Sequence, residues 1–267
     1  MSTATDALYI RAPSNRRAHV LFDFPILRWG MHRPKQDSEG LKRQAAQAAL
    51  DQVRSGMVLG LGTGSTVAHL LDALGEALAS KALSDIVGVP TSVQTERRAQ
   101  ALGIPLVGLA DRDRIDLTID GADEISPQLD LIKGGGGALL REKMVAQAST
   151  RLVIIADAAK RVERLGTTFA LPIEVVRWEW QTHVRFLRDW GADAALRLGP
   201  DGQPVASDNG QIFLDCRFPG GIEDPAALEN ALARRAGVVE TGLFLDLADE
   251  AIIASTHGVE TIRRVAE

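Results

Sequence analysis

The chain has 267 residues, of which 45% are hydrophobic and 24% are charged, as in an ordinary globular protein of one large domain or two small ones. A formal net charge of −5 disfavours nucleic-acid binding as the main function, although a few local basic groups suffice for one small anion. The single cysteine, Cys216, excludes an internal disulfide and a cysteine-rich zinc site. The five histidines show no pair at the spacing of metal ligands. No apolar run is long enough to span a bilayer. We therefore expect a cytoplasmic protein that uses no metal or other cofactor and that binds neither nucleic acid nor membrane.

Residues 1–36 differ from the rest of the chain. They are strongly basic and show no steady hydrophobic period, and they lack the apolar core and small-residue cleavage site of a secretory signal. We interpret them as a flexible extension or as the product of a start codon assigned too early, since Met31 stands just before the regular pattern begins. A transit peptide is the weaker alternative.

From residue 37 onward, apolar strands alternate with amphipathic helices. Asp37 or Ser38 can cap a first helix, and a strand at 57–61 then leads through a glycine-containing break into a second helix with an apolar stripe from Val67 to Leu78. The pattern continues with strands at 86–89, 105–109, 115–120 and 151–157 and with helices at 95–102 and 138–148. This alternation predicts an α/β fold with a parallel, Rossmann-like sheet covered on both faces.

After Gly166 the order of the predicted strands and helices changes. We expect a strand at 171–176, a helix at 179–190, strands at 194–198 and 211–218, a helix that begins at Asp224-Pro225, and a strand at 238–245. The order β-α-β-β-α-β is typical of a small ferredoxin-like α+β domain. A strand at 251–255 returns to the first sheet, and 258–265 closes the chain as a helix. The predicted domains are therefore 37–165 with 245–267, and an inserted domain at 166–244.

The segment 60–66, Gly-Leu-Gly-Thr-Gly-Ser-Thr, stands where the first strand ends and a helix begins. Glycines let backbone amides approach an anion, and the helix offers unpaired N–H groups. The segment lacks the third glycine of a dinucleotide fingerprint and the Gly-Lys-Ser/Thr of a Walker loop. It therefore favours a phosphate slightly over a tight turn without a ligand.

The segment 120–124, Asp-Gly-Ala-Asp-Glu, places three carboxylates at the end of another strand. Carboxylates accept hydrogen bonds from polyol hydroxyls, so the segment suits a sugar. A solvated acidic turn is the alternative interpretation.

The segment 133–143 begins with Lys133 and four consecutive glycines and continues into a helix that contains Glu142. A glycine run of this length lowers stability, so it favours close contact between backbone and a ligand. A lysine beside a row of amides can stabilise an oxyanion. An isolated Glu142 would be interpreted as a surface residue that pairs with a neighbouring cation, but its position beside these glycines makes it a candidate base.

Taken together and in this order, the three segments resemble the signature of the type A ribose-5-phosphate isomerase family, and the similarity extends from about Leu41 to Ile262. Further matching stretches are Ala156-Asp157 with Lys160, 171–175, 207–210, 237–239 and 242–244. Leu140 departs from the family, in which a threonine is frequent at this position, and the basic extension has no family counterpart.

The resemblance implies a catalytic Rossmann-like domain with a ferredoxin-like lid, a small pentose phosphate as the only partner besides the protein's own copies, and a homodimer or homotetramer. It implies that Glu142 is the proton acceptor. The residues that it assigns to substrate binding are Thr63, Gly64, Ser65, Thr66, Asp120, Gly121, Ala122, Asp123, Lys133, Gly134, Gly135, Gly136 and Lys160, with Lys42 as a further candidate.

The expected reaction interconverts D-ribose 5-phosphate and D-ribulose 5-phosphate. It passes through a cis-enediolate, and one carboxylate moves a proton between C2 and C1. We expect enclosure by the lid to raise the pKa of Glu142, since a free glutamate is a weak base for a carbon acid. Lys133 and glycine amides would stabilise the enediolate oxygen. Asp120 is the candidate for opening the furanose ring, and Asp123 would orient hydroxyls.

Two rival functions share this architecture. An effector-binding module of a transcription regulator would sense a sugar phosphate without transforming it, but it would have no need for Glu142, and residues 1–35 show no helix-turn-helix pattern. Another aldose–ketose phosphate isomerase or a sugar-phosphate deaminase could use the same fold. The order of the three segments favours ribose 5-phosphate.

Overall fold

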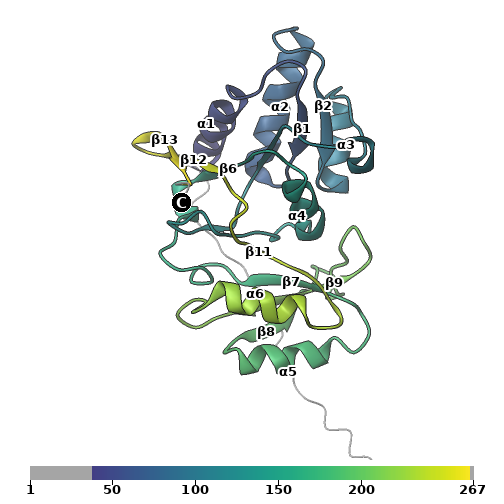
Figure 1. Ribbon diagram of the computed structural model, residues 1–267, viewed down its shortest axis with the longest axis vertical. Coiled ribbons are helices and arrows are strands. Elements are labelled where there is room, and N and C mark those ends of the chain that lie inside the picture. The colour runs from purple at the N-terminus through teal and green to yellow at the C-terminus, as the bar shows by residue number, and fades with distance from the viewer. Residues whose placement is uncertain (1–37, 265–267) are drawn as a thin grey trace, which may run out of the picture.

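The computed structural model describes residues 38–264 (Figure 1). The predicted extension 1–36 and the possible cap at Asp37 lie outside these residues. Within them, none of the helices has the length and apolar character that crossing a membrane requires.

A six-stranded sheet, drawn in the upper part of Figure 1, forms the larger body of the molecule. Its strand order is β13-β12-β6-β3-β1-β2, and all neighbours are parallel except the edge pair β12–β13. The strands are β1 (Val58–Leu61), β2 (Val87–Pro90), β3 (Leu117–Asp120), β6 (Leu152–Asp157), β12 (Glu250–Ser255) and β13 (Gly258–Arg263). The predicted parallel sheet is confirmed.

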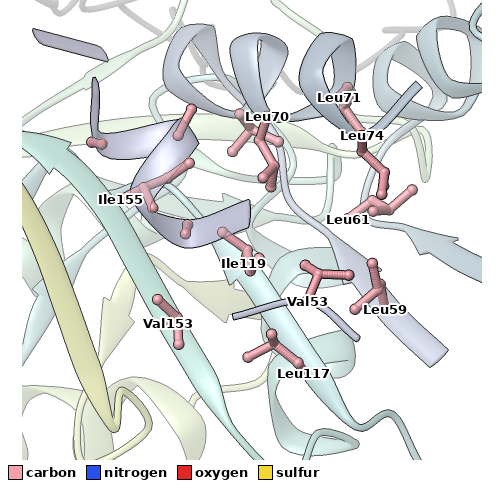
Figure 2. Close-up of a cluster of buried hydrophobic side chains, with 14 of the residues drawn as sticks. Val53, Leu59, Leu61, Leu70, Leu71, Leu74, Leu117, Ile119, Val153 and Ile155 are labelled. Carbon is pink, nitrogen blue, oxygen red and sulfur yellow. The ribbon is translucent and has the colours of Figure 1, made fainter. Parts of the chain in front are cut away.

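Helices cover both faces of this sheet because its strands are apolar on both sides. On β6, Val153 and Ile155 pack toward α1 (Ser38–Leu50) and α2 (Ser65–Ala79), whereas Ile154 and Ala156 belong to a cluster on the opposite face, beside α4 (Leu139–Gln147). Figure 2 shows the leucines of α2 above the side chains of β1, β3 and β6. A further helix beside this sheet, α3 (Val93–Ala101), packs against α2.

A second, four-stranded sheet lies below the first in Figure 1 and is antiparallel throughout, in the order β10-β7-β9-β8. Its elements are β7 (Leu171–Val175), α5 (Gln181–Asp189), β8 (Asp193–Leu196), β9 (Ile212–Arg217), α6 (Pro225–Ala233) and β10 (Val238–Thr241). Alternate residues of β7 (Leu171, Ile173, Val175) pack with the apolar residues of both helices. The order β-α-β-β-α-β matches the sequence prediction.

A small three-stranded antiparallel sheet joins the two bodies and was not predicted. It contains β4 (Glu124–Ile125), β5 (Leu131–Ile132) and β11 (Leu243–Phe244). The predicted strand 238–245 is therefore two strands that belong to different sheets. The chain crosses between them at Gly242, where an added Cβ would lie 2.3 Å from the Lys133 carbonyl oxygen, so glycine is required there.

Two further predictions were wrong. Residues 258–263 form the edge strand β13 instead of a helix, because the chain reverses at residues 256–257 and pairs Gly258 with Ser255 in a hairpin. Residues 105–109 form only an isolated bridge, Leu106 to Gly88, followed by a short 3₁₀ helix η1 (Leu109–Asp111). Pro105 has no N–H to donate to a longer ladder.

The order of the strands determines where a ligand can bind. β1 lies between β2 and β3 in the sheet. The chain therefore leaves β1 to form β2 on one side of it and later forms β3 on the other side. A crevice opens at such a switch point, outside the carboxyl ends of the strands. Two of the three motifs, 60–66 and 120–124, stand at the carboxyl ends of β1 and β3.

Candidate active site

A cavity of about 650 Å³ lies at this switch point. It brings together all the predicted site residues except Asp120, which is buried beneath it. The predicted residues in its wall are Lys42, Thr63, Gly64, Ser65, Thr66, Gly121, Ala122, Asp123, Lys133, Gly134, Gly135, Gly136, Glu142 and Lys160. Segments far apart in the sequence therefore form one site.

The N-terminus of α2 forms one end of the cavity. Gly64 precedes the first helical residue with φ of 130°, a conformation that favours glycine, and the first main-chain bond of the helix runs from Ala68 N–H to the Gly64 carbonyl. The amides of the first turn therefore have no partner inside the helix. The hydroxyls of Ser65 and Thr66 make no hydrogen bond within residues 38–264. This end of the cavity is a cradle for an anion.

The side chain of Thr63 has a different task. Its hydroxyl is buried and lies 2.8 Å from the hydroxyls of Thr91 and Ser92 and 3.1 Å from that of Thr95. The Thr95 hydroxyl in turn donates to the Gly62 carbonyl at 2.8 Å. This hydroxyl cluster fixes the loop from behind, so the Thr63 hydroxyl holds the loop in position.

Asp120 connects the floor of the cavity to the loop above it. Its side chain is 1% exposed; Oδ1 accepts from the amides of Thr63 (3.0 Å) and Gly121 (2.7 Å), and Oδ2 lies 3.0 Å from Lys133 Nζ. Both carboxylate oxygens are thus occupied by protein groups. Asp120 fixes the loop and Lys133 in position and does not reach the cavity surface.

Lys133 lies at the centre of the site and is 2% exposed. Its ammonium group contacts three acceptors: the Gly121 carbonyl at 2.6 Å, Asp120 Oδ2 at 3.0 Å and Glu142 Oε1 at 3.1 Å. Burial opposes the charge, but the adjacent Asp120 and Glu142 carboxylates raise the pKa of Lys133 above its ordinary value. Because an ammonium group has three N–H donors, these contacts use all of them.

Glu142 projects from the first turn of α4 into the cavity and is only 4% exposed. Oε1 accepts from Lys133, whereas Oε2 is buried and has no hydrogen-bond partner within residues 38–264. Burial is the largest cause that raises the pKa of Glu142, to about 8; Lys133 opposes the rise and Asp120 and Asp123 add to it. The direction of this shift is the expected one, with burial as its cause, and Oε2 is the oxygen that can accept a proton.

The glycines 134–136 of the loop after β5 form another part of the cavity wall. Asp123, which lines the cavity, accepts from the Gly135 amide at 2.8 Å through Oδ2. A Cβ at Gly135 would lie 2.8 Å from both Asp123 Oδ1 and the ring of Phe169, so any side chain there would displace its neighbours. The backbone of this loop therefore lies close to protein groups, and its expected contact with a ligand stays a prediction.

Two further lysines reach the cavity. Lys160 lies in a short 3₁₀ helix, η2 (Ala158–Lys160), after β6, and its Nζ is 6.0 Å from the centre of the Phe169 ring. Lys42 lies on α1 and pairs with Glu39 at 2.7 Å. Both can offer positive charge to an anion in the cavity.

Sequence reasoning missed Thr168 and Phe169, which line the cavity from the segment that leads to the second sheet. Glu124, fully buried, holds this segment: Oε2 accepts from the Gly166 amide at 2.5 Å, and Oε1 accepts from the amides of Thr168 (2.5 Å) and Phe169 (2.6 Å) and from the Thr168 hydroxyl (2.7 Å). The position of Glu124 in the acidic motif was the available signal. Its partners lie more than 40 residues away, which hid its role.

Within residues 38–264, no group of three or more His, Cys, Asp or Glu side chains has an arrangement that could hold a metal ion. Two acidic groups of the site, Asp120 and Glu142, instead pair with the Lys133 ammonium group. The arrangement combines an anion cradle and a carboxylate of raised pKa in one cavity. It is suited to proton transfer on a small anionic molecule.

Comparison with known proteins identifies relatives of this arrangement. Residues 87–258 match the family model of ribose 5-phosphate isomerase A (phosphoriboisomerase A). The chain is 52% identical to a ribose-5-phosphate isomerase A of Chloroflexus aurantiacus over 225 residues, which is 84% of this chain and 94% of the relative. It is 46% identical to a probable chloroplastic ribose-5-phosphate isomerase 3 of Arabidopsis thaliana, across 85% of this chain and 84% of that protein.

Solved structures give the same result. A D-ribose-5-phosphate isomerase in complex with phospho-erythronic acid is 41% identical, with a TM-score of 0.83 across 85% of this chain and 99% of the other. The ribose 5-phosphate isomerase of Plasmodium falciparum is 38% identical, with the same TM-score across 85% of this chain and all of the other. The similarity therefore extends over most of the chain.

Proposed function

The chain belongs to the ribose 5-phosphate isomerase A family, and from this premise we propose that its cavity interconverts D-ribose 5-phosphate and D-ribulose 5-phosphate, an aldose–ketose isomerisation in the non-oxidative branch of the pentose phosphate pathway. One observation supports this site most directly: Glu142 Oε2 is buried, has a raised pKa and lines the cavity without a partner among residues 38–264. The relatives bear the name of this enzyme and not that of a sugar sensor or a deaminase, which disfavours both rivals.

The substrate phosphate is placed at the N-terminus of α2. The free amides of this turn and the hydroxyls of Ser65 and Thr66 are donors for phosphate oxygens, and the helix dipole favours negative charge there. Lys42 and Lys160 add positive charge. The sugar would then extend toward Glu142, in contact with residues 121–123 and 134–136 of the cavity wall.

Proton transfer is assigned to Glu142. Its free oxygen removes the proton from C2 of the open-chain aldose, which gives a planar cis-enediolate, and the same oxygen returns a proton to C1. Burial limits the access of water to the carboxyl group, so most of the transferred protons stay with it between the two steps. One carboxylate on one face of the intermediate can carry out both proton transfers at carbon, while the proton of the C2 hydroxyl moves to the C1 oxygen of the enediolate.

The two aspartates have separate tasks. Both oxygens of Asp120 are engaged by backbone amides and Lys133, so we assign it the positioning of the phosphate loop and of Lys133 in place of direct contact with the furanose ring. Asp123 lines the cavity, and no residue in 38–264 donates a hydrogen bond to its Oδ1. It is the better candidate for orienting the hydroxyls and for proton exchange with the ring oxygen.

A division into two domains is supported by the contacts that surround the cavity. We place the catalytic domain at 37–165 and 245–267 and the lid at 166–244, with Phe169 and Thr168 at the junction as part of the cavity wall. The lid would exclude water from the enediolate. A homodimer or homotetramer is proposed on the family resemblance alone. A cytoplasmic location is proposed on the composition, although one relative is named as chloroplastic.

A direct assay tests the proposed function. Purified protein in the presence of a chelator should bring ribose 5-phosphate and ribulose 5-phosphate to equilibrium from either side, followed by absorbance of the ketose or by NMR. The rate should be unchanged by the chelator, because the assigned proton transfer uses protein groups only. Absence of turnover would contradict the function, and a loss of rate in chelator would contradict metal independence.

The pH dependence of this reaction follows from the pKa of Glu142. The base must be ionised to remove the C2 proton, and burial raises its pKa to about 8. We therefore expect kcat/KM to fall as the pH decreases below about 8 and to level off above it, until other groups titrate. Initial rates between pH 5 and pH 10 would measure this. An ascending limb with its midpoint near the ordinary glutamate value of 4.5 would contradict the assignment.

A further inference from the structure

Arg197, which follows β8 in the second sheet, reaches the glycine loop of the cavity. Its Nη1 donates to the carbonyls of both Gly134 and Gly135, each at 3.1 Å. Arg197 does not line the cavity itself. It was not predicted from the sequence, and more than 60 residues separate it from the loop that it holds.

The guanidinium group has little freedom. Asp215 of β9 accepts from Nε through both carboxylate oxygens, at 2.9 Å and 3.1 Å, and the group lies 4.8 Å from the centre of the Phe213 ring. The Arg197 side chain is 14% exposed. A planar cation fixed by a carboxylate and by an aromatic face can hold two carbonyl groups in fixed directions.

These two hydrogen bonds determine the direction of the amide that follows. In a trans peptide the N–H points opposite to the C=O of the same plane. The Gly135 carbonyl points to Arg197, so the Gly136 N–H points away from it. Gly136 lines the cavity, and its N–H has no hydrogen-bond partner within residues 38–264. The Gly135 N–H, by contrast, is already bonded to Asp123.

The proposed reaction needs a donor at this place. The enediolate develops negative charge on oxygen, and Lys133 already uses its three N–H groups on Gly121, Asp120 and Glu142. Lys133 therefore supplies positive potential at the cavity wall, while a direct hydrogen bond has to come from another group. A backbone amide held in place before the reaction is suited to this task.

We propose that Arg197 is a positioning residue for catalysis: by holding the carbonyls of Gly134 and Gly135, it directs the Gly136 N–H toward the oxyanion of the intermediate. This inference rests on the proposed function and adds to it a residue of the second sheet. The positive charge next to the two carbonyls also polarises their peptide groups, which makes the amide a stronger donor. The second sheet thus contributes to the chemistry without touching the substrate.

The test compares Arg197→Ala with Arg235→Ala as a matched control. Arg235 also lies against a phenylalanine ring (Phe186, 4.3 Å) and donates to a backbone carbonyl (Thr182, 3.0 Å), but all its contacts lie within α5 and its surroundings. Arg197→Ala should lower kcat about 30-fold, less than the 10²–10³ lost when an oxyanion donor is removed outright, and should change KM less than about 3-fold. Arg235→Ala should lower the melting temperature and leave kcat within about 2-fold of native.

Three additional measurements separate positioning from general damage. Phospho-erythronic acid, which is bound in the structure of a relative, should bind Arg197→Ala about 10-fold or more weakly and Arg235→Ala normally, by calorimetry. Millimolar guanidinium chloride should restore part of kcat in Arg197→Ala, because the ion fits between Asp215 and Phe213, and should leave Arg235→Ala unchanged. Arg197→Lys, which keeps the charge but not the fork, should retain an intermediate kcat, and it replaces the alanine variant if that one fails to fold.

The proposal would be overturned by a folded Arg197→Ala with native kcat, or by equal losses of kcat in the Arg197 and Arg235 variants. These outcomes differ from failure of the proposed function itself. If Glu142→Gln abolishes turnover while Arg197→Ala preserves it, only the positioning role is wrong. If Glu142→Gln preserves turnover, the assignment of the base is wrong, whatever the Arg197 variants do.

Discussion

Replacement of Glu142 by glutamine should lower kcat for ribose 5-phosphate by about 10³-fold or more, with KM changed much less. Glutamine fills the same space and can still accept from Lys133 through its amide oxygen. It cannot take up a proton at the position of Oε2, the oxygen that lines the cavity without a partner among residues 38–264. The loss should therefore fall on the chemical step, and ligand binding should be preserved.

Solvent exchange measures the same step independently. In deuterated water the native enzyme should introduce deuterium at the transferred position, because some protons of Glu142 exchange before the second transfer, and Glu142→Gln should show almost none. Glu142→Asp is the matched variant: it keeps a carboxyl group but withdraws it by one methylene, so a smaller loss is expected. A Glu142→Gln protein with near-native turnover would show that another group is the base.

The same substitution should stabilise the protein at high pH. The pKa of Glu142 is raised in the folded state from 4.5 to about 8, so between these values the folded state binds more protons than the unfolded one. Folding stability from this group is complete below pH 4.5 and decreases as the pH rises toward 8. Glutamine does not ionise, so Glu142→Gln should melt at a higher temperature than the native protein near pH 9 and at a similar one near pH 4. A lower melting temperature at pH 9 would mean that burial does not oppose this charge.

The main features of the fold were predictable because they are local in the sequence. β6 is a continuous apolar run, and α2 has a clear apolar stripe above a glycine turn, so both elements and the parallel sheet could be predicted. The failures are elements that depend on distant partners. β4 and β5 have two residues each and exist only through their pairing with one another and with β11, and β13 exists only because a hairpin places it beside β12.

In the candidate site, too, the features that are local in the sequence were predictable, and those that depend on distant contacts were not. Glu142, Lys133 and the glycine loops could be selected because catalytic groups stand at strand ends and helix starts, where the chain must change direction. The separate roles of the neighbouring acidic residues could not be predicted from the sequence. Asp120, Asp123 and Glu124 lie within five residues, but one is bonded to Lys133 and the loop amides, one lines the cavity, and one holds residues 166–169. Only the three-dimensional contacts separate them.

Replacement of Lys133 by methionine should reduce both catalysis and stability. The ammonium group lies 3.0 Å from Asp120 and 3.1 Å from Glu142, and all three side chains are at most 4% exposed. Methionine has a similar length but leaves two buried carboxyl groups without their cation, and breaking a buried ion pair costs about 3–5 kcal/mol. The positive potential beneath the enediolate is also lost, so kcat should decrease by about 10²-fold or more.

The pH dependence of the Lys133→Met variant provides the sharpest evidence. Lys133 is the group that holds the pKa of Glu142 down against burial, so its removal should raise that pKa further and move the ascending limb of the rate profile to higher pH. Protonation of Glu142 relieves the unpaired charge, so the loss of unfolding free energy in urea should be larger at pH 9 than at pH 6.

Lys143→Met is the matched control for this variant. Lys143 is also buried and lies 5.0 Å from the ring of Phe244, the ring that Lys133 approaches at 5.4 Å, but it pairs with Glu229 and Glu240 outside the cavity. Its replacement should lower stability and leave the midpoint of the pH–rate profile in place. If the Lys133 and Lys143 variants shift this midpoint equally, or if Lys133→Met changes KM alone, then the ammonium group of Lys133 neither controls the charge of Glu142 nor stabilises the intermediate.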